Sequence, residues 1–108
     1  MAARNSEALD VLLRVAADPR VSWRTVELAG RGISADAASA GWVMSEGKHA
    51  LSGEDMSDLL IEQGDLVDAL AESWQSFETG TISGADFETA LERVVLGFED
   101  WMARATRK

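Results

Sequence analysis

Residues 74–91 read WQSFETGTISGADFETAL, and this stretch predicts where one helix ends and the next begins. Gly80 is well placed to terminate a helix, because glycine readily adopts the left-handed backbone conformation that commonly follows a helical C-terminus. Ser83 followed by Asp86 has the pattern of a capping box, with aspartate in place of the usual glutamate. Because the turn over residues 79–82 is short, we expect the two flanking helices to be antiparallel neighbours.

The segments on both sides of this turn have the apolar periodicity of helices. Ser52 with Asp55 predicts the start of the earlier helix, and the later one is expected to run to about Arg104. Before the turn, the apolar stripe consists of Met56, Leu60, Val67, Leu70, Trp74 and Phe77, and the polar residue Gln63 occupies one position of the same stripe. After the turn, it is Phe87, Leu91, Val94, Val95, Phe98, Trp101, Met102 and Ala105.

The first half of the chain predicts three shorter helices. One is expected over about 6–17, capped by Asn5 or Ser6 and stopped by Pro19. Its apolar stripe is Ala8, Leu9, Leu12, Leu13 and Ala16. A second is expected to start after Ser22 and to end near Gly30 or Gly32, since glycine interrupts helices. The third is expected over 34–44, and a loop over 45–53.

These elements together predict an all-α fold. Hydrophobic residues make up 46% of the 108 residues, which is enough to form a core, and no stretch alternates as a strand does. We therefore expect residues 1–108 to form a single α-helical domain, a small bundle of about five helices with a C-terminal antiparallel hairpin.

Composition also narrows the chemistry and the compartment. The chain has no cysteine, which excludes disulfides, thiol catalysis and thiolate zinc sites. No stretch approaches the roughly 18 apolar residues of a membrane span, and residues 1–6 lack the features of a signal peptide. We therefore expect a cytoplasmic protein that does not enter a membrane.

The net charge of −9 is distributed unevenly. Residues 1–50 carry six basic and six acidic side chains, whereas residues 51–108 carry thirteen acidic and four basic ones. An electrostatic field of this sign repels nucleic acid and anionic membranes and attracts basic proteins. An acidic surface that only confers solubility is the competing interpretation.

Five acidic residues of the earlier helix are spaced by three and four positions and so form a stripe of their own. They are Asp58, Glu62, Asp65, Asp68 and Glu72. Like charges at this spacing repel by a few tenths of a kcal/mol per pair, and five carboxylates in one row exceed what solubility requires. We therefore predict that this stripe binds a partner.

Four tryptophans are many for this length. Trp74 and Trp101 lie on the apolar stripes and are expected in the core. Trp42 lies beside a glycine-rich helix boundary, and we predict that it is an exposed anchor for a partner, because large aromatic side chains dominate interface energetics.

Catalytic and metal-binding patterns are missing from the sequence. His49 is the single histidine, and no nucleophile or orienting acid lies at a distance in the sequence that is typical of a catalytic motif. Metal sites in helical bundles use paired glutamates and Glu-x-x-His motifs, which this chain lacks. We therefore predict a protein that is not an enzyme and binds no metal or cofactor.

Residues 26–44 (VELAGRGISADAASAGWVM) resemble a helix-turn-helix of the lac-repressor type. This resemblance implies a small transcriptional regulator as an alternative function. The stretch departs from the pattern in two ways, because Arg31-Gly32 is inserted in the turn and the second helix carries Asp36 but no side chain that usually reads bases. The net charge also opposes direct contact with nucleic acid.

Residues 74–91 resemble the hairpin of the small helical immunity proteins that protect bacteria from colicin-D-like toxins, which cleave transfer RNA. The shared pattern is Phe-x-x-Gly-x-Ile-Ser-x-x-acid-Phe. In that family, acidic side chains block a basic, RNA-binding active site. The resemblance implies that the acidic stripe at 58–72 is the corresponding surface here.

Our leading hypothesis is an inhibitor or adaptor whose acidic side chains occupy the basic, nucleic-acid-binding surface of a partner protein. A nuclease toxin and a defence complex blocked by a phage-encoded inhibitor both present such a surface, and the charge pattern fits either. A third hypothesis is a structural helical subunit whose hairpin packs against itself as a homodimer.

Overall fold

A computed structural model of the chain describes residues 5–43 and 53–107, which fold into four α-helices and no strand. The helices are α1 (Asn5–Ala17), α2 (Trp23–Trp42), α4 (Gly53–Glu78) and α5 (Gly84–Arg107). This confirms the all-α prediction for the described residues. His49 and the predicted loop, apart from Gly53, lie outside them.

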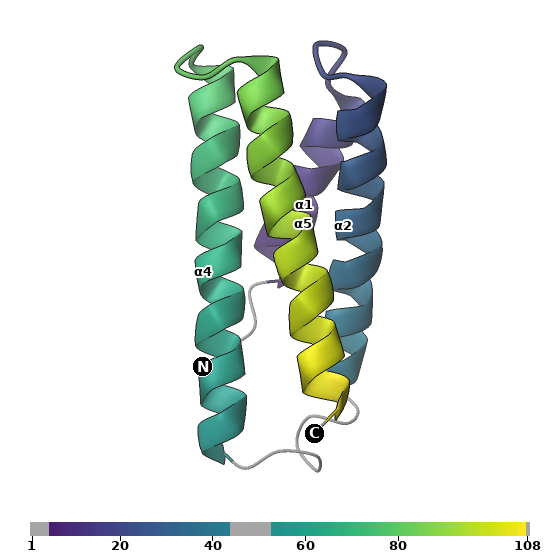
Figure 1. The fold of residues 1–108 in the computed structure, drawn as a ribbon, viewed down its shortest axis with the longest axis vertical. Coiled ribbons are helices and arrows are strands. Elements are labelled where there is room, and N and C mark those ends of the chain that lie inside the picture. The colour runs from purple at the N-terminus through teal and green to yellow at the C-terminus, as the bar shows by residue number, and fades with distance from the viewer. Residues whose placement is uncertain (1–4, 44–52, 108) are drawn as a thin grey trace.

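The helices form an up-and-down bundle, in which α2 and α5 run in one direction and α1 and α4 in the other (Figure 1). Two contacts at opposite ends show that α2 and α5 are parallel. The hydroxyl of Ser22 donates to Glu88 at 2.6 Å, and the rings of Trp42 and Trp101 meet at the far end with centroids 6.1 Å apart.

Each helix packs against two neighbours around the bundle. α1 contacts α2 and α4, and α5 also contacts α2 and α4, so α2 and α4 lie diagonally across from each other. With 13 residues, α1 is half as long as α4, which has 26. At about 1.5 Å per residue, these lengths are about 20 and 39 Å, so α1 covers only the part of the bundle near the two turns (Figure 1).

α2 is one continuous helix where the sequence predicted two, so the expected boundary between residues 30 and 34 is wrong. Its buried positions keep a single helical phase throughout: Thr25, Leu28, Ala29, Gly32, Asp36 and Ser39. Several of these residues are small or polar, so an apolar pattern does not reveal the stripe. Packing by neighbouring helices outweighs the low helix propensity of the glycines.

The predicted turn between α4 and α5 is confirmed. Gly80 has a φ of +77°, a left-handed conformation that side-chain-bearing residues rarely adopt. The hydroxyl of Ser83 accepts from the amide of Asp86 at 3.1 Å, and Ser22 caps α2 in the same way through the amide of Thr25. Both hairpins are therefore defined by local sequence signals.

The turn between α1 and α2 is fastened to the end of α4. Arg20 donates to both carboxylate oxygens of Asp18 and lies over the ring of Phe77, 4.8 Å from its centroid. The side-chain hydrogen bonds from Arg20 hold the pKa of the Asp18 carboxyl below its usual value. These contacts join the two turns at one end of the bundle.

The main core lies where all four helices meet. Its buried residues are Ala8, Leu12, Val15, Leu28, Ala29, Val67, Leu70, Trp74, Phe87, Leu91, Val94, Val95 and Phe98. Trp74 is 5% exposed, which confirms its predicted place. The predicted stripe of α1 was partly wrong, because Leu9 and Leu13 are exposed and Val15 is buried in their stead.

A second, smaller core lies at the end that α1 does not reach. It contains Leu59, Trp101 and Ala105, with Trp42 among the half-buried residues packed against it. Trp101 is 1% exposed, as predicted, and its indole Nε1 donates to the backbone carbonyl of Leu59 at 2.7 Å. This hydrogen bond ties α5 to the first turns of α4.

A buried polar layer separates the two cores. Gln63 lies one turn after Leu59 and one turn before Val67, and it is 1% exposed. Its Nε2 donates to the hydroxyl of Ser39 at 2.9 Å, whereas its carbonyl Oε1 has no hydrogen-bond partner in the described part of the chain. Asp36, 3% exposed, lies one turn before Ser39 on α2.

The hydrogen bond between Gln63 and Ser39 predicts that a double variant of these residues is more stable than a single one. Ser39→Ala leaves the Nε2 of Gln63 buried without its acceptor, so the free energy of unfolding should fall by about 1–3 kcal/mol. Adding Gln63→Met removes the stranded amide with little change in volume, and urea denaturation should show stability restored at least to that of the unchanged protein. A double variant as unstable as the single one contradicts this account of the layer.

Candidate functional site

Every charged residue of α4 is acidic. No basic residue occurs from Gly53 to Glu78, whereas this helix carries eight carboxylates. They are Glu54, Asp55, Asp58, Glu62, Asp65, Asp68, Glu72 and Glu78. Because an α-helix has 3.6 residues per turn, five exposed members share one side. We call these five the acidic face: Glu54, Asp58, Asp65, Asp68 and Glu72.

The structure places four of the five predicted acidic residues on this face. Glu62 is the exception, since it turns towards α5 and both of its carboxylate oxygens accept from Arg104. Arg104 also donates to Asp100 at 2.8 Å. The hydrogen bonds to Glu62 raise the pKa of the Arg104 guanidinium further above its already high value, so the guanidinium stays charged. Glu62 therefore joins α4 to α5.

An exposed isoleucine lies among these carboxylates. Ile61 is 48% exposed, three residues after Asp58 and four before Asp65, and so belongs to the same side of α4. Ile61 was not among the site residues predicted from the sequence. Its spacing in the sequence could have revealed it, because Ile61 falls on the same side of the helix as the acidic residues. The buried positions of α4 are Leu59, Gln63, Val67, Leu70 and Trp74.

Several carboxylates of the acidic face have no cation beside them. Within residues 5–43 and 53–107, no basic side chain pairs with Asp58, Asp65 or Glu72. The arginines that form ion pairs do so elsewhere: Arg14 with Asp10, Arg20 with Asp18, Arg24 with Glu27 and Glu92, Arg31 with Glu99, and Arg104 with Glu62 and Asp100. The charges of Asp58, Asp65 and Glu72 are therefore available to a partner.

Trp42 is not the exposed side chain that the sequence predicted. It is half-buried, and its ring meets that of Trp101 edge to face, with an interplanar angle of 90°. It occupies the open side of the smaller core, beyond the reach of α1. The exposed tryptophan is Trp23, at 87%. In one continuous helix, the positions of Trp23 and Trp42 relative to the buried stripe of α2 determine how far each is exposed. The sequence prediction placed a helix boundary near residue 32 and therefore did not relate Trp42 to that stripe.

The continuous course of α2 also removes the predicted helix-turn-helix. Residues 26–42 belong to one helix, so the turn and the separate second helix that this motif requires are absent from the described part of that stretch. Asp36, expected on a base-reading helix, is instead buried in the polar layer. The geometry of this segment thus does not support the resemblance.

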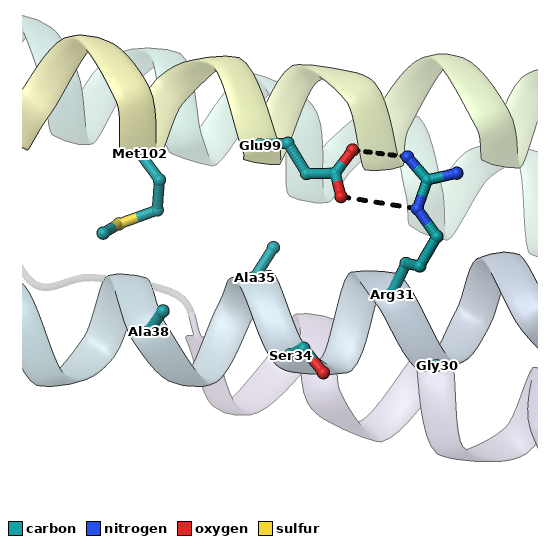
Figure 2. Close-up of a pocket in the computed structure, with 7 residues that line it drawn as sticks. All are labelled: Gly30, Arg31, Ser34, Ala35, Ala38, Glu99 and Met102. Carbon is teal, nitrogen blue, oxygen red and sulfur yellow. Dashed lines mark hydrogen bonds and ion pairs between the residues drawn. The ribbon is translucent and has the colours of Figure 1, made fainter.

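A groove of about 520 Å³ runs between α2 and α5 (Figure 2). It is lined by Gly30, Arg31, Ser34, Ala35, Ala38, Glu99 and Met102. Its only charged side chains bind each other, since Arg31 donates to both carboxylate oxygens of Glu99, the shorter bond being 2.6 Å. The groove therefore offers small and apolar contact surface with its charges already neutralised.

Among the described residues, no cluster of three or more histidine, cysteine, aspartate or glutamate side chains could hold a metal ion. None of the described helices combines the length and apolarity that crossing a membrane requires. Comparison of the chain with protein-family models, curated proteins and solved structures found no match in any of the three.

The exposure of Ile61 predicts that the acidic face can be altered without unfolding the protein. Ile61→Ala should change the free energy of unfolding by about 0.5 kcal/mol or less, as is usual for exposed positions. Leu70→Ala is the matched control on the buried side of α4, and it should cost about 2–5 kcal/mol. Thermal and urea denaturation of both variants provide the measurement, and equal losses would contradict the assigned phase of α4.

Proposed function

We propose that this chain is a non-enzymatic binding protein whose acidic face docks on the basic, nucleic-acid-binding surface of a partner protein. One observation carries the proposal: Ile61 is exposed between Asp58 and Asp65, and neither of these carboxylates pairs with a basic side chain in the described chain. Nothing in the fold of the described residues requires an isoleucine at this position, since the core of α4 lies on its other side.

The carboxylates and Ile61 contribute to different steps of binding. The carboxylates attract a positively charged surface over a distance of about a Debye length and so speed the encounter. The side chain of Ile61 then enters an apolar pocket, and its desolvation supplies affinity that screened surface charges do not. Relief of repulsion between the aligned carboxylates adds a smaller contribution.

The geometry of the face suits competition with nucleic acid. Asp58, Asp65 and Glu72 follow one another at seven-residue intervals, or about 10 Å along the helix axis. A straight row of negative charges about 21 Å long spans roughly six phosphates of a nucleic-acid strand at about 3.4 Å each. A surface shaped to track a phosphate backbone can therefore accept α4 in its place.

Two classes of partner meet this description. The resemblance of residues 74–91 to immunity proteins favours a nuclease toxin, because those proteins shield an RNA-binding active site in this way. A nucleic-acid-binding defence complex, blocked by a phage-encoded inhibitor, presents the same kind of surface. In both cases the bound chain excludes nucleic acid by occupying its binding site.

Neutralising the acidic face tests the proposal. The tagged chain captures its partner from a host lysate, and the association rate is then measured with the variant Asp58→Asn/Asp65→Asn/Glu72→Gln. The rate should fall at least about tenfold at low salt, and the difference should shrink as salt screens the charges. Glu62 is left unchanged because its loss would break the contact between α4 and α5.

The matched control is Asp10→Asn/Glu27→Gln/Asp86→Asn, which removes equal charge from other helices. It should leave the association rate within about twofold of the original, since local and not total charge steers docking. Equal effects of the two triple variants contradict a specific acidic face. A captured partner that does not bind nucleic acid would contradict the proposal that the chain inhibits nucleic-acid binding.

A further inference from the structure

The exposed side of α2 differs in character from the acidic face. It begins with Trp23, the most exposed of the large apolar side chains in the described chain. Gly30, Ser34 and Gly41 continue the same side at helical spacing, and all three are exposed. A Cβ placed on Gly30 or Gly41 meets nothing within 4 Å. Glu27, which pairs with Arg24 at 3.3 Å, is exposed on this side between Trp23 and Gly30. One bulky residue thus precedes a helical surface made mostly of small residues.

Neighbouring features extend this surface on both flanks. On the α5 flank lies the groove of Figure 2, whose two charged residues bind each other. On the α1 flank, Ala16 shares a shallow pocket with Trp23. Leu13 and Leu9, one and two turns before Ala16, are 51% and 37% exposed. Exposed apolar side chains therefore occur on both helices of the first hairpin, α1 and α2.

Charge separates this hairpin from the rest of the molecule. Residues 5–43 carry five acidic and four basic side chains, whereas residues 53–107 carry thirteen acidic and three basic ones. Because α2 and α4 lie diagonally across the bundle, the exposed side of α2 points away from the acidic face (Figure 1). Two copies of a chain with net charge −9 therefore repel each other least through α1 and α2.

We propose that a second copy of this chain docks on the exposed side of α2, with the two α2 helices antiparallel. The order of residue sizes along α2 favours this pairing. With a two-fold axis beside residue 32, Trp23 of each copy lies opposite Gly41 of the other, and Gly30 lies opposite Ser34. The bulky side chain meets the open glycine at both ends, as a self-complementary interface requires.

The available area fits a weak dimer. At about 10 Å in diameter, α2 is about 30 Å long and α1 about 20 Å long, which gives roughly 500 Å² per copy. The total of roughly 1,000 Å² falls among weak and transient protein interfaces. We expect a dissociation constant in the micromolar range, with Trp23 as the principal anchor.

The dimer does not depend on the proposed function, but it has a consequence for it. The acidic faces of the two copies point outwards on opposite sides, so one dimer presents two docking surfaces. A partner that is itself dimeric or clustered is then bound with a higher effective concentration for the second contact.

Sedimentation velocity over protein concentrations from about 1 µM to about 1 mM tests the dimer, since this range brackets micromolar dissociation. The mass should rise from monomer to dimer. Trp23→Ala and Gly30→Gln should each raise the dissociation constant at least tenfold. The side chain at position 30 projects into open space in the monomer and improves helix propensity, so neither variant should lower the melting temperature.

Ile61→Ala on the opposite side of the bundle is the matched control and should leave the dimer unchanged. Added salt should tighten the dimer, because it screens repulsion between two acidic copies. A monomer at every concentration overturns the proposal, as does a dimer that neither α2 variant weakens. Loss of partner capture by Ile61→Ala with an intact dimer separates this inference from the proposed function.

Discussion

The contact of three helices at Gly32 sets the orientation of everything else in the bundle. A Cβ at this position would lie 3.1 Å from a methyl group of Leu12 on α1 and 3.3 Å from one of Val95 on α5, so a side chain here would have to displace both by a few tenths of an ångström. This contact fixes the rotation of α2 about its axis. The buried stripe then continues through Asp36 and Ser39, and Trp23 and Gly30 face outwards. With α2 fixed on α1 and α5, α4 closes the bundle diagonally opposite.

The closure of the bundle by α4 determines which carboxylates remain free. Leu59, Val67 and Leu70 face the interior, so the side with Asp58, Ile61 and Asp65 faces outwards. Glu62 lies at the edge between these two sides, where Arg104 reaches it from α5. The same row of acidic residues therefore has two physical roles. Glu62 holds helices together, whereas Asp58, Asp65 and Glu72 carry charge that no basic side chain of the described residues pairs with.

Much of the second half was predictable from the sequence because its signals are local. Glycine in the left-handed conformation, a serine cap and strongly apolar stripes each act within a few residues, and both Gly80 and Ser83 behave as expected. The first half was less predictable because its buried positions include Thr25, Gly32 and Ser39. Glycine usually interrupts a helix, but the packing of the whole buried stripe of α2 against α1 and α5, which are far away in the sequence, outweighs this tendency at Gly32. The prediction that Trp42 is the exposed tryptophan was wrong for the same reason, because the sequence did not show that residues 23–42 form one helix.

Methyl NMR with labelled isoleucine tests the central claim most directly, because the chain has three isoleucines in three separate places. Ile61 lies on the acidic face, Ile33 on α2, and Ile82 in the turn between α4 and α5. When a captured partner is added, the Ile61 signal should shift strongly or broaden, while the signals of Ile33 and Ile82 should change little. An unperturbed Ile61 signal beside a strongly perturbed Ile33 or Ile82 would contradict the assignment of the acidic face as the binding surface.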